Sequence, residues 1–433
     1  MATIPSLALL PSGYKASKVY SVLPTDGTGD FDFTRSGNAT RVNSEGLIEL
    51  VTTNVPRLNY PLIDGVVQGC PSLLLEPQRT NLIQYSEDFS NAYWTKSGSS
   101  VTSGQLSPSG DLSAFKLVEN NSTGAHWIVV TSFVETSSSL NKTFSFYVKK
   151  GERKFIGYVD TRFANGCEAV FNLENETIVR TSGTLFINAK IENFGNGYFK
   201  CSITYGGGAD TRTNPAIALL DDNYSGASVL SYTYTGNGLS GNFIFGVQLE
   251  VSSYPTSYIP TNGSQVTRVA ETANGAGDAS TFNDLEGVLF AEMSALADDG
   301  TFRFISLSDG TLSNRVSLFF STSNTLNGSV NGISSIGGFV GIQNNNKVAF
   351  KYKSGDYALW VNGIEVGIST SITGNHSNLD RLNFDYGQGS DDFYGNTKQI
   401  QYFDSSLNDT DLETLTSWTS FSEMATSQLY TIE

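Results

Sequence analysis

The chain has 433 residues, of which 39% are hydrophobic and only 16% charged, and its formal net charge is −16 at pH 7. This length predicts two to four domains with a sizeable core. The acidic balance, with no local basic cluster to offset it, argues against binding to nucleic-acid phosphates or to anionic membrane surfaces. No apolar run reaches the roughly 18 residues of a membrane-spanning helix, so no membrane insertion is expected.

The rest of the composition favours short strands. Glycine occurs 43 times, and Ser, Thr and Asn are abundant; the last three compete for backbone hydrogen bonds in helices and suit turns. The three cysteines, Cys70, Cys167 and Cys201, are too few and too scattered for a disulfide framework or a zinc site, so free thiols are expected. The apolar run "IPSLALL" near the N-terminus has no basic residue before it, so export by the general secretory route is not expected.

Residues 1–83 are predicted to form a short N-terminal anchor and connector. Residues 1–34 are expected to hold one or two strands and no helix, and "ATRVNSEGLIELV" reads as two strands around the turn "NSEG". "PSLLLEPQRTNLI" is a buried apolar run interrupted by Pro77. Within it, Glu76 and Arg79 either tie the segment to the next domain or form a solvated pair.

Residues 84–270 are predicted to form a β-sandwich. Strand-like runs such as "TFSFYVKKG", "YFKCSITYGG" and "NFIFGVQLEV" recur roughly every 15 to 20 residues, bounded by Gly, Asn, Asp and Ser. This succession is typical of a two-sheet sandwich or jelly roll. Residues 271–283, "ETANGAGDASTFN", are small, polar and glycine-rich, and are predicted to be a linker.

Residues 284–420 are predicted to form a second jelly roll. "VAFKYKSGDYALWVNGIEV" reads as three strands with a turn at Asn362-Gly363. "NDTDLETLTSW" predicts a helix capped by Asn408 or Asp409, and residues 421–433 are expected to be a tail. The predicted fold class is therefore all-β: a short N-terminal anchor, two tandem β-sandwich (jelly-roll) domains and one short C-terminal helix.

The sequence holds no recognisable catalytic motif. His126 and His376 lie in different predicted domains and no nucleophile elbow accompanies them, so both are expected to be packed or surface histidines. Adjacent acidic residues such as Asp221-Asp222 point to opposite faces of a strand, and so do not by themselves supply the paired carboxyls of a glycosidase. No cofactor is predicted, apart from calcium bound by acidic loops as an alternative to solvated loops. The calcium candidates are Asp298, Asp299, Asp391 and Asp392.

Carbohydrate binding uses exposed aromatic faces together with amide and carboxylate hydrogen bonds. Trp94, Trp360 and Trp418 are expected to be packed. Trp127 follows the polar loop "ENNSTGA" and is the best exposed aromatic candidate, against a core interpretation. Tyr224, Tyr232 and Tyr234 form a second aromatic group and complete the set of carbohydrate-binding candidates.

Four sequence motifs resemble bacteriophage virion proteins of the tail-fibre, head-fibre and receptor-binding type: "GNATRVNSEGLIE", "NVPRLNYP", "CPSLLLEPQRTNLIQYSEDFSNAYWTKSG" and "QLEVSSYPTSYIPTNGSQVTR". In those proteins similar motifs join a virion-proximal segment to a carbohydrate-binding-module-like β-sandwich. The last 150 residues, with "KVAFKYKSGDYALWVNGIEVG" and "TKQIQYFDSSLNDTDLETLTSW", resemble a concanavalin A-like, LamG-type jelly roll. The resemblance implies a virion structural or adhesion role and homotrimerisation, and it supplies no catalytic residues.

Three hypotheses follow. The first is a non-enzymatic virion protein, assembled in the bacterial host cytoplasm, whose N-terminal segment contacts other virion proteins and whose sandwiches bind host-surface glycan. The second is a purely structural decoration or connector protein without glycan binding. The third, a fibre-borne polysaccharide depolymerase, would require clustered acids in a groove, which the sequence does not indicate.

Overall fold

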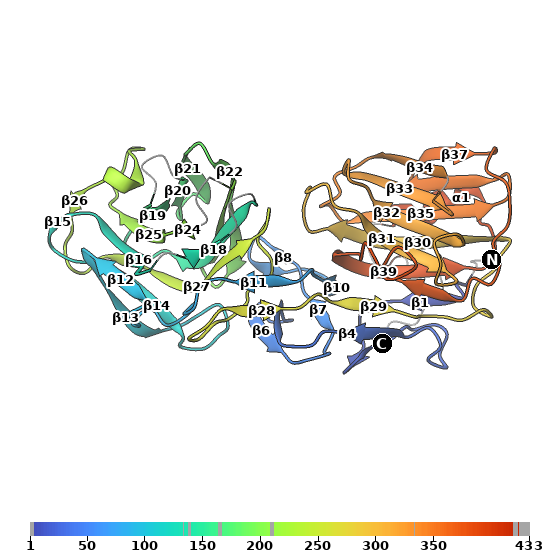
Figure 1. Cartoon of the computed structure of the whole chain (residues 1–433), viewed down its shortest axis with the longest axis horizontal. Coiled ribbons are helices and arrows are strands. Elements are labelled where there is room, and N and C mark those ends of the chain that lie inside the picture. Colours follow the sequence, from blue (N-terminus) through green and yellow to red (C-terminus); the bar gives the residue numbers. More distant parts are fainter. Residues whose placement is uncertain are drawn as a thin grey trace.

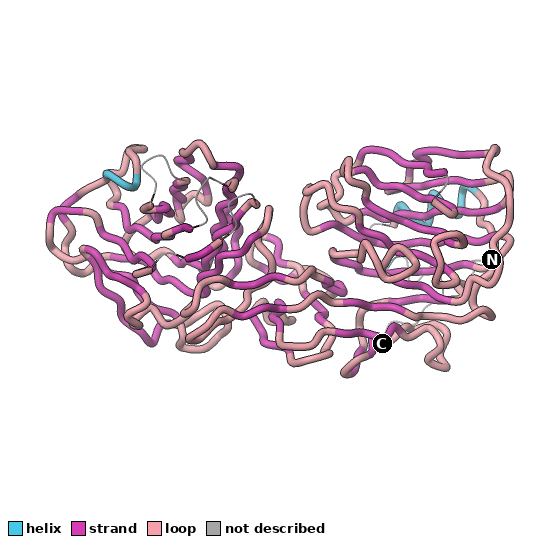
Figure 2. Tube along the Cα trace, in the orientation of Figure 1, coloured by secondary structure: helices cyan, strands magenta, loops and turns pink. Residues whose placement is uncertain are grey.

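The computed structural model describes residues 4–132, 134–136, 140–162, 167–207, 212–332, 334–418 and 423. The chain forms two β-sandwich lobes, and strands of the N-terminal segment run along one side of both (Figure 1). Strands dominate the trace, and the α-helix α1 (Asp409–Ser417) is short (Figure 2). The all-β prediction is therefore confirmed. In the described part of the chain, no helix is long and apolar enough to cross a membrane.

The first sandwich consists of two six-stranded sheets. Phe144, Phe146 and Val148 alternate along one strand and point into the core, where Phe144 meets Tyr158 of the opposite sheet with ring centroids 4.7 Å apart. The first sheet has the order β12 (Trp94–Ser97), β16 (His126–Val130), β25 (Pro215–Leu220), β19 (Phe155–Asp160), β20 (Glu168–Asn172) and β21 (Thr177–Ser182). The second has the order β13 (Ser99–Gln105), β14 (Ala114–Glu119), β27 (Gly241–Val251), β18 (Lys142–Lys149), β23 (Tyr198–Tyr205) and β22 (Phe186–Gly195).

Short elements complete this lobe. Strands β15 (Thr123–Gly124) and β26 (Tyr234–Thr235) pair at one end, as do β17 (Val134–Glu135) and β24 (Arg212–Thr213), and a 3-10 turn covers Val229–Ser231. Cys167 and Cys201 are buried in the core of the lobe, and both are free, as is the exposed Cys70. The expectation of free thiols is confirmed.

The second sandwich packs an eight-stranded sheet against a five-stranded one. The predicted run of three strands and the helix with its Asn408 cap are confirmed; the Asn408 side chain accepts from the Asp411 N–H, and Leu412 and Leu415 pack against the large sheet. The large sheet has β37 (Ile364–Ser369), β36 (Tyr357–Val361), β35 (Asn346–Lys353), β30 (Glu286–Ala295), β39 (Gly395–Phe403), β10 (Ser72–Leu75) and β7 (Arg57–Asn59), and β1 (Leu7–Leu9) also pairs with β39. The small sheet has β34 (Ser334–Phe339), β33 (Thr325–Val330), β32 (Arg315–Phe320), β31 (Arg303–Ser308) and β38 (Arg381–Asn383).

Residues 4–83 do not form a structural unit of their own, because several of their strands belong to the second sandwich. Strands β1 and β10 lie end to end along one edge of β39, with Leu9 opposite Ile400 and Leu73 opposite Thr397. Leu7, Leu9, Leu73 and Leu75 of these strands are buried in the core of the second sandwich. An uninterrupted apolar strand such as "LLL" suits this position because both of its faces are covered. The first sandwich is thus an insertion between strands that belong to the second.

The predicted linker over residues 271–283 is wrong. Strand β29 (Thr272–Asn274) pairs with β4 (Phe31–Thr34), and β2 (Tyr14–Lys15) and β3 (Lys18–Val19) complete a four-stranded sheet. Ala273, Ala276 and Phe282 are buried in the core. Gly277, at φ +80°, lets Phe282 pack so closely that a Cβ would lie 2.4 Å from its ring. The small residues of this segment serve close packing rather than flexibility.

The remaining connector strands join the lobes. The predicted hairpin around "NSEG" is confirmed as β5 (Ala39–Val42) and β6 (Ile48–Val51), and β8 (Leu62–Ile63) pairs with β9 (Val66–Val67). Strand β11 (Arg79–Asn81) enters the first sandwich beside β28 (Val266–Arg268), which leaves it. The described part of the range 1–34, residues 4–34, holds four short strands rather than one or two. The predicted tail, residues 421–433, lies outside the described residues apart from Glu423.

If β10 belongs to the core of the second sandwich, Leu73→Ala should lower the free energy of unfolding by about 2–5 kcal/mol, because it leaves a cavity among buried side chains. Leu50→Ala is the control, since Leu50 lies on the connector with 53% of its surface exposed. Its effect should stay within about 0.5 kcal/mol. Urea denaturation measures both, and equal small losses would show that β10 is only loosely attached.

Candidate functional site

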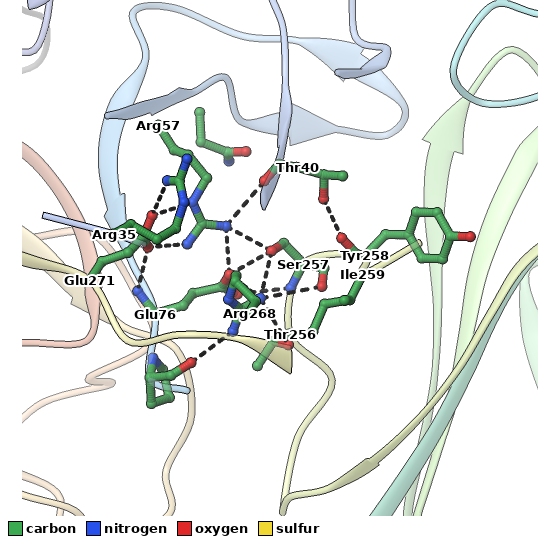
Figure 3. Close-up of polar contacts among 12 residues, drawn as sticks. Arg35, Thr40, Arg57, Glu76, Thr256, Ser257, Tyr258, Ile259, Arg268 and Glu271 are labelled. Carbon is green, nitrogen blue, oxygen red and sulfur yellow. Dashed lines mark hydrogen bonds and ion pairs between the residues drawn. The ribbon is translucent and has the colours of Figure 1, made fainter. Parts of the chain in front are cut away.

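Five charged side chains meet between the lobes, and none exposes more than 3% of its surface (Figure 3). We call them the charge cluster: Arg35, Arg57, Glu76, Arg268 and Glu271. Arg35 Nη1 lies 2.7 Å from Glu271 Oε1, and Arg57 Nη1 lies 2.6 Å from Glu76 Oε2. Arg268 Nη1 lies 2.8 Å from the same Glu76 oxygen, and Arg57 Nε donates to Glu271 at 2.9 Å. The cluster therefore ties β4, β7 and β10 to β28 and β29.

Backbone and hydroxyl groups complete the cluster. Arg57 also donates to the Thr40 carbonyl at 3.1 Å, and the Ser257 N–H donates to Glu76 at 2.8 Å. Burial alone would raise the pKa of Glu76, but the charges of Arg268 and Arg57 and the Ser257 hydrogen bonds hold that pKa well below its usual range. Since each carboxylate faces two guanidinium groups, the charges offset one another's loss of hydration.

The predicted tie through Glu76 exists, but its predicted partner is wrong. Glu76 pairs with Arg57 and Arg268. Arg79 instead donates to the Gln78 carbonyl at 2.8 Å, and its guanidinium lies 5.6 Å from the Tyr254 ring centroid. Glu76 lies just after β10 and Arg79 begins β11, and the two side chains reach different partners.

A cleft of about 770 Å³ opens beside the cluster, between the two sandwiches. This volume lies within the range of small-molecule sites. One wall is the outer face of β22 and β23, the floor is the connector together with residues 253–258, and the other wall belongs to the second sandwich. The walls and floor include Asn188, Lys190, Glu192, Lys200, Ser202 and Thr204, then Thr40, Tyr60, Glu76 and Thr256, then Leu296, Asp298, Asp299, Gln343 and Asn396.

Several polar groups of the cleft are available to a ligand. Among the described residues, none hydrogen-bonds the side-chain amides of Asn141, Asn188 or Gln343, and Asn188 and Gln343 are exposed. Tyr60 and Phe194 are half-buried aromatic residues of the same cleft, and Phe194 packs edge-on against the buried Tyr147 at 4.9 Å. Free amides beside half-exposed rings are the groups that bind sugar hydroxyls and sugar faces.

The sequence did not single out these residues. In "FINAKIENF", Asn188, Lys190 and Glu192 alternate, which places them on one face of a strand. Tyr60 lies within the quoted "NVPRLNYP". The alternation and the motif were both visible in the sequence. Whether this strand face lines a cleft, however, depends on where the connector and the second sandwich lie.

The predicted aromatic candidates gather on the outer face of the other sheet of the first sandwich. Tyr224 and Tyr234 are buried, so little of either ring is open to a sugar. The Tyr234 hydroxyl donates to Glu119 at 2.7 Å, and that of Tyr232 donates to Asp221. Tyr232 and Trp127 are half-buried against a small apolar cluster, so only these two retain partly open faces.

The four calcium candidates do not converge on a metal site. Asp299 pairs with Arg303 at 2.6 Å, and Asp392 accepts the Tyr394 hydroxyl at 2.8 Å. Burial raises the pKa of Asp392, an effect that the Tyr394 hydrogen bond partly opposes. Throughout the described ranges, no group of three or more His, Cys, Asp or Glu side chains is arranged to hold a metal ion. The calcium candidates, Asp298, Asp299, Asp391 and Asp392, lie outside the regular strands, and calcium binding there stays a prediction.

Both histidines are packed, as expected. His126 is buried, and its Nε2 lies 3.2 Å from the Tyr234 carbonyl oxygen. His376 is buried beside Tyr352, and burial lowers its pKa to about 4, against the smaller opposing effect of Asp284. His376 is therefore uncharged at neutral pH.

No family model matches the chain, and no curated protein matches it. Among solved structures it is similar to the CBM40 of the Ruminococcus gnavus IT-sialidase, with 16% identity and a TM-score of 0.27 over 33% of this chain and 87% of that one. It is also similar to domain 4 of a GH43 extracellular arabinanase from Geobacillus stearothermophilus, with 11% identity and a TM-score of 0.28 over 38% of this chain and 83% of that one. The similarity to Trypanosoma rangeli sialidase has 10% identity and a TM-score of 0.29 over 74% of this chain and 61% of that one. These TM-scores are too low to argue for a family or a function.

Replacing Glu271 with Gln should lower the free energy of unfolding by about 3–5 kcal/mol, because buried Arg35 then has no carboxylate and Arg57 keeps only Glu76. The matched control is Glu49→Gln, which breaks a pair with Arg41 whose carboxylate is 41% exposed. Its effect should stay below about 1 kcal/mol. Urea denaturation of the two variants compares them, and similar losses would mean that the cluster does not hold the lobes.

Proposed function

We propose that this protein is a non-enzymatic bacteriophage virion protein of the fibre or appendage type that binds host-surface carbohydrate. The observation that carries the glycan-binding part is the cleft between the sandwiches, with its free amides and half-exposed aromatic rings. An amide both donates and accepts, so it matches the paired donor and acceptor character of a sugar hydroxyl. An aromatic face covers the apolar face of a sugar ring.

The acids of the cleft support binding rather than hydrolysis. Glu76 belongs to the charge cluster, Glu192 pairs with Lys190 at 2.6 Å, and Asp299 pairs with Arg303. Of the acids in the described lining, Asp298 alone has no ion pair or hydrogen bond within the chain. A glycosidase generally uses two carboxyl groups on either side of the scissile bond. Because three of the four acids in the described lining are already paired with basic groups, the cleft favours an adhesin over a depolymerase.

The virion assignment rests on the resemblance of the quoted motifs. Those motifs contain Arg57, Glu76, Arg268 and Ser257, which are charge-cluster residues or bind them. A projecting appendage needs domains that keep their relative position. The connector pairs with the second sandwich through β10, and its Asn81 side chain hydrogen-bonds to Val247 and Leu249 of β27 in the first. The same resemblance supports a homotrimer attached to other virion proteins.

Purified protein should bind oligosaccharides on a glycan array, and Tyr60→Ala should weaken that binding roughly tenfold because it removes a stacking ring from the cleft. Trp127→Ala, on the outer face of the first sandwich, should change affinity less than about twofold. A strong loss with Trp127→Ala alone would place the glycan site on that face instead. No binding to any glycan would favour a purely structural role.

Antibody labelling should find the protein on purified phage particles at regularly spaced positions, because an appendage occupies a fixed site in the virion. Electron microscopy of labelled particles measures this. A lysate protein of similar abundance that is not part of the virion serves as the control. Absence of label, with the protein still present in the lysate, would contradict the virion assignment.

A further inference from the structure

We infer that the ligand of the cleft is an uncharged oligosaccharide held between the two sandwiches. This inference rests on the proposed function and adds the chemical class of the sugar and its manner of contact. It follows from the charges of the lining and from the origin of its free amides.

The positive charges of the cleft are already engaged within the chain. Lys190 pairs with Glu192, Arg41 pairs with Glu49 at 2.8 Å, and Lys200 donates to the Thr256 carbonyl at 2.9 Å. Lys200 also lies directly opposite Glu192 in the ladder of β22 and β23, where side chains are near neighbours. Two of these three basic side chains thus already face a carboxylate, and the third already donates a hydrogen bond.

The unengaged charge of the cleft is negative. Asp298 is exposed and, within the described part of the chain, has neither an ion pair nor a hydrogen bond. The other acids of the described lining, Glu76, Glu192 and Asp299, are each paired with a basic group, so the charge of Asp298 is left over in a chain whose net charge is −16. An anionic sugar would therefore be repelled over the distances at which salt does not screen the charges. A neutral sugar meets no such cost.

The free amides come from both walls. Asn141 and Asn188 belong to the first sandwich, and Gln343 belongs to a loop of the second. Tyr60, on the floor, comes from the connector between them. A sugar chain lying in the cleft can thus accept and donate hydrogen bonds on both sides while one ring stacks on Tyr60. Loss of either wall should weaken the same ligand.

The test uses the full-length protein and purified oligosaccharides of four to six sugars, one set of neutral hexoses and N-acetylhexosamines and one set containing uronic or sialic acids. Isothermal titration calorimetry at about 50 and 500 mM NaCl measures affinity, because high salt screens charge interactions but leaves neutral hydrogen bonds. We expect binding by a neutral sugar that changes less than about twofold with salt. Asn188→Ala and Gln343→Ala should each weaken it roughly fivefold to tenfold.

One variant serves as a control. Asn175→Ala removes an exposed amide outside the cleft, and it should change the affinity for a neutral sugar less than about twofold. Circular dichroism and the melting temperature confirm that every variant is folded.

The possible results distinguish a failure of the neutral-sugar inference from a failure of the proposed glycan binding. Salt-sensitive binding of acidic sugars that Asn188→Ala weakens would overturn the inference and leave glycan binding in the cleft intact. Binding that depends on Asn188 but not on Gln343 would overturn the contact with both sandwiches. Failure of every oligosaccharide to bind would overturn the proposed function itself.

Discussion

The buried charge cluster is the constraint on which the rest of this structure depends. Three guanidinium groups and two carboxylates from four separate stretches of chain share one buried site. A buried charge without a partner is costly, so the four stretches must pack together for the cluster to form. That condition fixes β7 and β10 against β28 and β29. It thereby fixes the first sandwich, whose chain enters and leaves through β11 and β28, against the second.

This arrangement explains why the connector cannot be separated from the domains. Strands β1, β7 and β10 extend the large sheet of the second sandwich, and β4 pairs with β29. The first sandwich is therefore inserted into the framework of the second rather than strung after it. Insertion gives two connections between the lobes instead of one. The walls of the cleft are consequently held by paired strands rather than by a single flexible link.

The cleft is a product of the same geometry. Its floor shares Thr40, Glu76 and Ser257 with the cluster or its hydrogen-bond partners. Its walls are polar faces that each sandwich would otherwise expose to water. The amides and the aromatic ring that make it suitable for sugars come from three different parts of the chain. The binding surface therefore belongs to the assembled molecule and not to either sandwich alone.

The sequence by itself determined the local structure. Alternating strands, the "NSEG" and Asn362-Gly363 turns, the Asn408 helix cap and the free thiols follow from short-range periodicity and turn chemistry, which act within a few residues. It also indicated which motifs matter, because the motifs that carry the phage resemblance contain most of the charge-cluster residues.

Only the tertiary structure decided what those residues contact. Glu76 meets Arg268 across 192 residues of chain, as the numbering shows, and no local pattern encodes such a pairing. Glycine and alanine in residues 271–283 suit a flexible linker or close packing equally well, and the neighbouring Phe282 and β4 selected the second. The elements that pack against each face likewise decided that Tyr224 and Tyr234 are buried and that one face of β22 stays open.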